Sequence, residues 1–397
     1  MPLTKILKIF GMLLLIFSLQ CTIFPHAFDQ AEAKELKRVT VFQSGTEGYD
    51  TFRIPAMIRA NDGTLLAFAE GRVEGAGDSG NIDLVLKRSF DNGKTWGPLQ
   101  VIGDNGDNVF GNPAPVVDRK TGTIVLLSTH NAGNVSEMDI RRGEVTQEQT
   151  RRIFVQYSYD SGGTWTEPAE ITKTTKRGNW RWYATGPGHG IQLKYNRKYN
   201  GRLIIPANHS VAPPAHSEDD GSENKYLSSH VLYSDDGGYS WEIGAVDETY
   251  GDINSYYANE QTAAELKNGK IYFNSRNQYG SGSNRLATYS SNGGLTYNQP
   301  FQPVADLITP VVQGSVLHFS SKNLLIFSSP GDPNERKNLT ISYSNHNGKK
   351  WRTRFVIPGY AAYSDLVSVG DNVGVLFENG IDGPYEKIDF IILKSDR

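Results

Sequence analysis

The sequence lacks the features that would point to a redox, nucleic-acid or membrane-embedded role. Its single cysteine, Cys21, lies near the N-terminus, so the rest of the chain has no disulfides and no thiolate chemistry. The formal net charge is only -3, without the basic excess that a nucleic-acid surface needs. Downstream of the N-terminus no apolar run is long enough to cross a bilayer, and helical periodicity is nearly absent.

The N-terminus is typical of a secretory signal peptide. Two lysines precede an apolar run over residues 9–19, which is too short to span a membrane. Ala31-Glu32-Ala33 supplies a small-x-small cleavage site, and Ala27 a second one, so residues 1–33 are predicted to be removed. The protein is therefore expected to be secreted or periplasmic, with a lipid anchor on Cys21 as the alternative.

The remaining chain, residues 34–397, is predicted to form one all-β domain. Gly, Tyr and Asn-Gly or Asp-Gly turns are frequent, which favours short strands joined by tight hairpins. A domain of this length is large, but closed β-architectures often reach it. The predicted strands are Val39–Phe42, Thr64–Ala69, Asp83–Lys87, Thr123–Ser128, Ile153–Tyr157, Arg202–Pro206, Ser229–Tyr233, Lys270–Asn274, Arg285–Tyr289, Asn323–Ser328, Asn338–Tyr343, Val373–Glu378 and Ile388–Lys394.

An internal repeat follows five of these strands. Each copy has a serine, a glycine four residues later and an aromatic residue at its end. Four of the five copies have an Asp or Asn two residues after the serine, and the last copy has His346 there. The side-chain oxygen of Asp or Asn can accept backbone N–H bonds within a turn, and glycine can adopt a positive φ angle. The copies are Ser89–Trp96, Ser158–Trp165, Ser234–Trp241 and two degenerate ones, Ser290–Tyr297 and Ser344–Trp351.

The spacing of the repeat predicts a six-bladed β-propeller of four-stranded antiparallel blades. Successive copies lie roughly 55–75 residues apart, which is enough for four strands with loop insertions. Five copies and one unmarked blade give six blades, and the terminal aromatic of each copy is expected to pack between neighbouring sheets. The strand at Val39–Phe42 is expected to pair beside Ile388–Lys394, which closes the ring and removes free edges.

Two motifs carry a resemblance to a known family. The repeats resemble the Asp boxes of sialidases, and Phe52-Arg53-Ile54-Pro55 resembles the (F/Y)RIP motif of the same enzymes. The chain is identified as a member of the bacterial exo-α-sialidase (neuraminidase) family, over nearly all of its mature length. The resemblance implies a retaining glycoside hydrolase that removes terminal sialic acids from glycoproteins, glycolipids and oligosaccharides. Asp boxes also occur in propellers with other activities, so the site needs its own argument.

Three arginines are expected to bind the substrate carboxylate. Sialic acid carries a carboxylate on its anomeric carbon, and guanidinium groups bind such an anion bidentately. The resemblance assigns this role to Arg53, to Arg276 at the end of an apolar strand, and to Arg336. Lys337 is the neighbour that a shift of one residue would select instead of Arg336.

The nucleophile and its base follow from the same carboxylate. A neutral phenol can approach an anionic substrate without the repulsion that an Asp or Glu would meet, and sialidases are known exceptions with a tyrosine nucleophile. Tyr363 matches the family position, with Tyr360 as the local rival. A phenol needs a base, which the resemblance assigns to Glu260. Glu265 is the alternative carboxylate, and its neighbours suggest an exposed position.

The general acid/base is expected on a glycine-rich loop that follows the strand ending near Glu70. Asp78 aligns with the catalytic aspartate of the family, with Glu74 and Asp83 as competitors. Asp83 begins the next strand and so favours a structural role. A loop Asp needs a raised pKa to act as an acid, which it can gain when the site closes on substrate. Arg72 is expected to bind substituents of the sugar.

Two further segments resemble parts of the family. Phe110–Pro115 is expected as a loop over the site, and Trp180–Gly190 supplies aromatics for the sugar or for packing between blades. His189 has no second histidine at metal-ligand spacing and is interpreted as structural. No metal or organic cofactor is predicted.

The expected reaction is hydrolysis through a tyrosyl-enzyme intermediate. Two alternatives stay open: a sialic-acid-binding propeller without catalytic activity, and a trans-sialidase or an enzyme that releases its product intramolecularly. The expected partners are sialylated glycans as substrate, with no nucleic acid and no integral membrane span. The protein is expected to be a monomer.

Overall fold

The computed structural model describes residues 36–251, 256–278 and 284–394. The predicted signal peptide, its cleavage sites and Cys21 lie outside these residues. None of the helices in the described ranges is long and apolar enough to span a membrane. The short helices are α2 (Glu137–Arg142), α3 (Thr172–Thr175) and the 3₁₀ helix η1 (Asn224–Tyr226).

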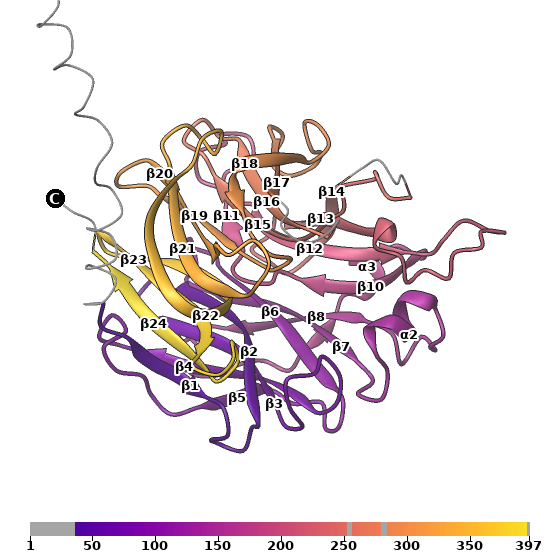
Figure 1. Ribbon diagram of the computed structural model, residues 1–397, viewed down its shortest axis with the longest axis horizontal. Helices are drawn as coiled ribbons and strands as arrows, with labels where there is room; N and C mark the ends of the chain where they lie inside the picture. The colour runs from indigo at the N-terminus through magenta and orange to yellow at the C-terminus, as the bar shows by residue number, and fades with distance from the viewer. Residues whose placement is uncertain (1–35, 252–255, 279–283, 395–397) are drawn as a thin grey trace, which may run out of the picture.

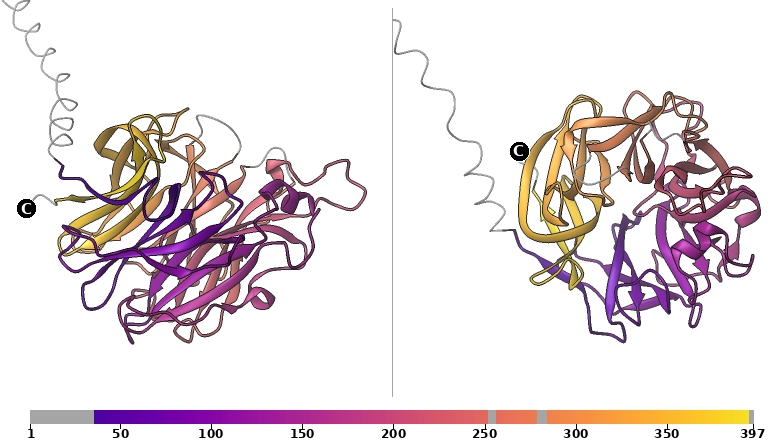
Figure 2. Two further views of the ribbon diagram at one scale, coloured as in Figure 1. Left: turned by 90° about the horizontal axis from the view of Figure 1, so that it is seen from below. Right: turned by 45° about the vertical axis from the view of Figure 1, so that its right-hand side comes forward.

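The strands form six four-stranded antiparallel blades. The right-hand view of Figure 2 shows them arranged around a central axis. From the inside outwards, the first blade consists of β2 (Thr51–Arg59), β3 (Leu65–Arg72), β4 (Ile82–Ser89) and β5 (Gln100–Gly103). The second consists of β6 (Val109–Val117), β7 (Ile124–Asn131), β8 (Arg152–Ser158) and β9 (Ala169–Glu170). The third consists of β10 (Trp180–Thr185), β12 (Leu203–Val211), β13 (Leu227–Ser234) and β14 (Glu242–Val246), and β11 (Ile191–Gln192) also pairs with β12. The fourth and fifth are β15 (Ala258–Glu265), β16 (Ile271–Asn277), β17 (Asn284–Ser290) and β18 (Gln302–Ile308); and β19 (Ser315–Phe319), β20 (Leu324–Pro330), β21 (Lys337–Ser344) and the first half of β22 (Arg352–Val369). The sixth is the second half of β22, β23 (Asn372–Gly380), β24 (Lys387–Leu393) and β1 (Val39–Gln43).

The two ends of the chain close the ring in the sixth blade. Strand β1 pairs with β24, with Val39 opposite Phe390, and the two strands lie side by side in Figure 1. The Thr40 hydroxyl donates to the Asp389 carboxylate at 2.8 Å. Pairing of the N-terminal strand with the last strand therefore satisfies an edge that would otherwise be open, as the sequence predicted.

The sequence prediction found one class of strand and missed another. All the predicted strands coincide with the second or third strand of a blade, or with β1. The innermost strands were all missed, as were the outermost strands other than β1. Five of the innermost strands contain a register shift: β2, β6, β10, β15 and β22. A bulge breaks the alternation of apolar and polar residues on which strand prediction rests.

The five copies of the repeat form turns between the third and fourth strands of their blades, and we call them the repeat turns. In the first, Asp91 accepts the backbone N–H of Thr95 at 2.9 Å and its hydroxyl at 2.7 Å, while Ser89 accepts the N–H of Gly93 at 2.8 Å. The same bonds recur at Asp160 and Asp236. The turns are therefore held by local polar contacts, as the sequence predicted.

Each repeat turn also packs against the preceding blade. Gly93 has a φ of 82°, and a Cβ there would overlap the ring of Phe390 in the sixth blade. Trp96 lies edge-on to the same ring, with the centroids 5.5 Å apart. The glycine thus serves both the left-handed backbone and the close approach of two blades. This packing between sheets is the one the sequence predicted for the aromatic residue.

Candidate active site

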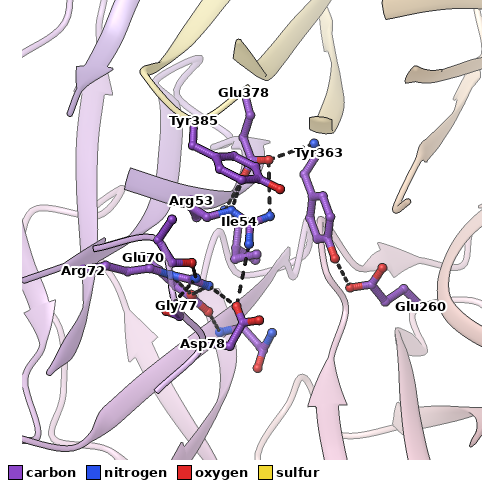
Figure 3. A network of polar contacts seen from close by, with 12 residues as sticks. Arg53, Ile54, Glu70, Arg72, Gly77, Asp78, Glu260, Tyr363, Glu378 and Tyr385 are labelled. Carbon is purple, nitrogen blue, oxygen red and sulfur yellow. Dashed lines mark hydrogen bonds and ion pairs between the residues drawn. The ribbon is translucent and has the colours of Figure 1, made fainter. Parts of the chain in front are cut away.

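A cavity of about 400 Å³ lies at one end of the central axis and is lined by polar side chains from several blades. All seven residues that the sequence singled out for the site line it: Arg53, Arg72, Asp78, Glu260, Arg276, Arg336 and Tyr363. Figure 3 shows the Tyr363–Glu260 pair on one side of this cavity and Asp78 with Arg72 on the other. The tertiary structure therefore brings together residues that are up to 310 positions apart in the sequence.

Tyr363 and Glu260 form the closest pair in the cavity. The Tyr363 hydroxyl donates to Glu260 Oε1 at 2.5 Å, and Glu260 Oε2 accepts from Arg276 Nη1 at 2.8 Å. The same Arg276 nitrogen lies 3.2 Å from the Tyr363 hydroxyl oxygen. A carboxylate positioned to take a phenolic proton, with a cation beside both groups, is the arrangement that activates a tyrosine nucleophile.

Two more guanidinium groups lie around the same tyrosine. Arg53 Cζ is 5.1 Å and Arg336 Cζ is 5.5 Å from the centroid of the Tyr363 ring. With Arg276, three cations from the first, fourth and fifth blades converge on one phenol. This convergence creates a site for an anion next to the hydroxyl group.

Glu378, which the sequence did not indicate, orients Arg53 and Tyr363 through hydrogen bonds and an ion pair. Its carboxylate accepts the backbone N–H groups of Ile54 at 2.9 Å and of Tyr363 at 3.0 Å. Its Oε1 also lies 3.3 Å from Arg53 Nε. Because one buried carboxylate contacts both the first arginine and the backbone of the tyrosine, it fixes their relative positions.

Asp78 is paired with arginines on the opposite wall. Its Oδ1 lies 2.8 Å from Arg72 Nη2 and 3.7 Å from Arg53 Nη1. The Asp78 side chain is 60% exposed, whereas Arg72 is buried and held by Glu70 at 2.6 Å. The aspartate can therefore meet a ligand from solvent while its cationic neighbour stays fixed.

The pKa values of Tyr363 and Asp78 shift in opposite directions. Burial and the charge of Glu260 raise the pKa of Tyr363, against the opposing arginines, so the phenol is neutral in the free protein. The surrounding protein partly desolvates Asp78, which raises its pKa, but the charges of Arg72 and Arg53 outweigh this effect and lower the net value. The free protein therefore holds Asp78 as a carboxylate, and the raised pKa that an acid needs is absent before substrate binds.

The inner strands reach the cavity through strained backbone. Ile54 has a φ of 57° and Asn112 a φ of 54°, and both lie in the bulges of their strands. A positive φ is especially unfavourable for a β-branched residue such as isoleucine. Bulges aim side chains away from the regular pleat, which is how β2 presents Arg53 and β6 presents Asn112 to the cavity.

The rival residues all lie elsewhere. Tyr360 packs its ring against the Lys337 ammonium group, 4.7 Å away, and neither residue lines the cavity. Glu74 is exposed outside it, and Asp83 is a buried partner of the Tyr49 hydroxyl at 2.7 Å, the structural role that was expected.

The expectation that Glu265 is exposed is wrong. The residue is only 6% accessible, at the end of β15. Its carboxylate accepts the backbone N–H groups of Lys194, Tyr195 and Asn196. The charged neighbours in the sequence suggested solvent, but a loop of another blade folds over this carboxylate and supplies its hydrogen bonds.

The two further segments also differ from expectation in part. Residues 110–115 belong to strand β6 rather than to a loop, and among them Asn112 lines the cavity. Trp182 lines the cavity, whereas Trp180 stacks on His209 within the core. His189 Nδ1 lies 2.7 Å from Asp365, and the described residues contain no cluster of three metal-ligating side chains.

Several cavity residues gave no signal in the sequence. Tyr385 accepts from Arg336 Nη1 at 2.6 Å and lies under the Arg53 guanidinium group, 4.2 Å from its Cζ. Arg151 is buried, donates to Asn112 at 2.7 Å and stacks on Trp182. Glu70, Glu137, Asn208 and Gln278 also line the cavity and were missed, as was Glu378 behind it. A count of acids near the motif arginines could have suggested Glu70, but none of the others stands in a repeated pattern.

Comparisons with known proteins agree with this geometry. A family model for the BNR repeat-like domain matches residues 63–375. The exo-alpha-sialidase of Aspergillus fumigatus is 29% identical over 360 residues, which cover 84% of this chain and 79% of that protein. Sialidase-2 of Rattus norvegicus is 30% identical over 392 residues, which cover 90% and 95%. The sialidase of Micromonospora viridifaciens is 30% identical over 85% of this chain, but the match spans only 51% of its own length.

Solved structures give the same fold. The Hadza microbial sialidase Hz136 has a TM-score of 0.76 at 24% identity, covering 90% of this chain and 68% of that one. An intramolecular trans-sialidase from Ruminococcus gnavus has a TM-score of 0.73 at 18% identity, covering 89% and 96%. Fold, cavity and relatives together define a glycoside hydrolase built on a six-bladed propeller. The chain belongs to the sialidase family.

Proposed function

We propose that this protein is an exo-α-sialidase that hydrolyses terminal sialic acids with retention of configuration through a tyrosyl-enzyme intermediate. The observation that carries the proposal is the Tyr363–Glu260 hydrogen bond of 2.5 Å inside a ring of three arginines. A nucleophile beside an anion site suits a substrate whose reacting carbon bears a carboxylate. Sialylated glycans are the class of substrate with this chemistry.

Substrate binding is assigned to Arg53, Arg276 and Arg336. Their guanidinium groups would hold the carboxylate and so place the anomeric carbon over the Tyr363 hydroxyl. Arg53 and Arg276 are each already paired with an acid, Glu378 and Glu260, which fixes their orientation before substrate arrives. Preorganised cations of this kind lose little orientational freedom on binding.

The first chemical step forms a bond from the Tyr363 oxygen to the anomeric carbon. The phenolic proton passes to Glu260, the bond to the leaving glycosidic oxygen breaks, and Asp78 donates a proton to that oxygen. In the second step Asp78 takes a proton from water, and the water oxygen attacks the same carbon. The bond from that carbon to the Tyr363 oxygen breaks, and this oxygen recovers its proton from Glu260. Two displacements on one carbon give net retention.

Asp78 must gain a proton before the first step. In the free protein the charges of Arg72 and Arg53 keep its pKa low. A substrate carboxylate bound at Arg53 would offset that cation, and a sugar over the loop would exclude water from the exposed side of Asp78. Both changes raise the pKa of the carboxyl group, which suits a general acid.

The test is hydrolysis of 4-methylumbelliferyl-N-acetylneuraminic acid by wild type, by Tyr363→Phe and by Tyr360→Phe as the matched control. Sialoside-specific release that survives in Tyr360→Phe and is nearly abolished in Tyr363→Phe supports the proposal. A Tyr363→Phe enzyme with wild-type kcat would disprove the nucleophile assignment. Absence of release by folded wild type, together with retained binding of sialic acid, would favour a binding propeller instead.

The outcome of the reaction is tested separately by following the first product with proton NMR. α-N-acetylneuraminic acid as the first product supports hydrolysis with retention. Transfer of sialic acid to added lactose, or an anhydro sugar as the product, would instead identify a trans-sialidase or an intramolecular one.

We also propose that residues 34–397 form the mature, secreted or periplasmic catalytic domain, acting as a monomer. Intact-mass measurement of the exported protein tests the cleavage site, and a lipid adduct on Cys21 would identify the anchored alternative. Light scattering during gel filtration tests the monomer, which a mass of twice the chain would contradict.

A further inference from the structure

The seams between neighbouring blades are filled by the aromatic residues of the repeat turns. Trp165 packs edge-on against Phe68 of the preceding blade, and Trp351 lies 6.0 Å from the ring of Tyr272 in its preceding blade. Trp241 and Tyr297 likewise belong to clusters that include residues of the preceding blade. Within the described residues, five of the six seams therefore receive an aromatic side chain from a repeat turn.

The seam between the fifth and sixth blades has no repeat turn to fill it. A repeat turn connects the third strand of a blade to the fourth, but in the sixth blade these strands are β24 and β1, from opposite ends of the chain. Ring closure through the termini thus removes the connection on which a sixth turn would sit. We call the space at this position the sixth seat, and Ile326, Tyr343, Val373 and Leu393 define it.

Strand register shows that the sixth seat corresponds to the place of Trp351 one seam earlier. In the fourth blade the serine of the repeat turn, Ser290, pairs with Ile271, and the next pair along the strands is Tyr272 with Tyr289. Both tyrosines flank Trp351. In the fifth blade the serine of the repeat turn is Ser344, and the pair next to it is Ile326 with Tyr343. These two residues line a cavity of about 330 Å³. The cavity therefore lies where the other seams hold an aromatic ring.

The lining of the sixth seat selects the chemistry of its ligand. Its walls are apolar, with Phe319, Leu324, Ile341 and Phe355 beside the four defining residues. Lys394 places an ammonium group at its rim, and the described part of the lining contains no acidic side chain. Apolar cavities lined by Leu, Ile and Phe bind flat hydrocarbon rings, and an ammonium group at the rim adds attraction for a negative charge.

We propose that the sixth seat is a binding site for a small aromatic anion, whose ring takes the place that tryptophan holds in the neighbouring seam. The site lies outside the catalytic cavity and shares no lining residue with it. Binding there would tie the fifth blade to the sixth at the point where the ring closes. A ligand of this kind would therefore stabilise the fold without blocking sialoside hydrolysis.

The test uses indole-3-propionate, which carries the ring of tryptophan and a carboxylate, and tryptamine as its cationic counterpart. For a ligand of this size we expect a dissociation constant on the order of 1 mM for indole-3-propionate and at least tenfold weaker binding of tryptamine. Ligand-detected NMR titration measures both. Equal affinity for the two probes, or no saturable binding, would overturn the proposal.

Three variants locate the site. Ile326→Trp fills the seat from within and should abolish binding, whereas Ile308→Trp adds the same side chain at a half-exposed position of β18 and should leave it unchanged. Lys394→Glu keeps the cavity, and it should weaken the binding of indole-3-propionate and strengthen the binding of tryptamine. Binding that survives in Ile326→Trp, or an unchanged preference in Lys394→Glu, would place the ligand elsewhere. Sialoside hydrolysis in the presence of saturating indole-3-propionate should keep its wild-type rate.

Discussion

The outer turns and the inner strands of this propeller differ in how they use sequence. The repeat turns have almost the same residues in each copy, and their hydrogen bonds join groups within a few positions of each other. The inner strands share no such pattern, and each contributes a different side chain to the cavity, such as Arg53 from β2, Glu260 from β15 and Tyr363 from β22. Repetition therefore marks the part that holds blades together, and divergence marks the part that performs chemistry.

The two regions also differ in their backbone. In each outer turn two consecutive residues have a positive φ angle: the repeat glycine, and before it Asn92, Ser161, Asn347 or a second glycine. In the inner strands Ile54 and Asn112 adopt it, beside the cavity. Buried acids such as Glu378 hold this strained backbone in place through its N–H groups. Among the described residues, Ile54 is the β-branched residue with a positive φ angle, so the most unfavourable backbone conformation of this kind lies beside the cavity.

The largest effect is expected on the kcat of a Glu260 variant, which is compared with a variant of Glu265 on the same strand, β15. Glu260→Gln removes the base, so kcat should fall by about 10²–10⁴-fold while the unfolding temperature hardly changes. Glu265→Gln should do the reverse, because that carboxylate accepts three backbone N–H groups and does not line the cavity. Steady-state kinetics and thermal unfolding of both variants check the pair. A Glu260→Gln enzyme that keeps its kcat would remove the base from the proposed mechanism.

The outer turns are tested by Trp241→Ala. This side chain is only 1% accessible and its indole N–H donates to Gly238 at 2.8 Å, so its loss should destabilise the fold by about 3–5 kcal/mol. The kcat of the remaining folded protein should stay at the wild-type value. Denaturant unfolding with parallel kinetics measures both. A large loss of kcat without loss of stability would contradict the separation between the two regions.

Acid should weaken the third blade through a buried histidine pair. His209 and His230 lie 3.0 Å apart, and burial holds the pKa of each well below its usual value. The unfolded chain binds protons at these sites below about pH 6.5, whereas the folded chain does not, so stability falls as pH drops through that value. Two sites give a slope of about 2.7 kcal/mol per pH unit. His230→Gln should lower the slope measured by denaturant unfolding at pH 5–6 by about 1.4 kcal/mol per pH unit, the contribution of one site, and an unchanged slope would contradict the assignment.

The smallest effect is expected at Tyr385. Removing its hydroxyl in Tyr385→Phe leaves the ring under Arg53 but takes a hydrogen bond from Arg336, so KM for a sialoside should rise about tenfold with little change in kcat. If Tyr385 acts through Arg336, adding Tyr385→Phe to Arg336→Ala should have no further effect. Steady-state kinetics of the double-mutant cycle, with Tyr360→Phe as control, measures this coupling. Additive effects would show that Tyr385 acts independently of the arginine.

Much of the fold was predictable because its signals are local. The second and third strands of every blade have regular apolar patterns. The repeat turns between the third and fourth strands can be recognised from a serine, an Asp or Asn in most copies, and a glycine. The seven candidate site residues were found through motifs that resemble those of a family. The first strands were missed because bulges and buried polar residues break their alternation.

The sequence by itself determined the number of blades, the turns that join them and the residue types of the site. Only the tertiary structure decided which acids orient those residues, because Glu378 meets Arg53 across 325 positions of the chain and Tyr385 meets Arg336 across 49. It also decided that Glu265 is buried and that, among the described residues, one seam has no aromatic residue from a repeat turn. Hydrogen bonds within a turn depend on neighbours in sequence, whereas contacts at the axis depend on closing a ring of six blades, which no local pattern encodes.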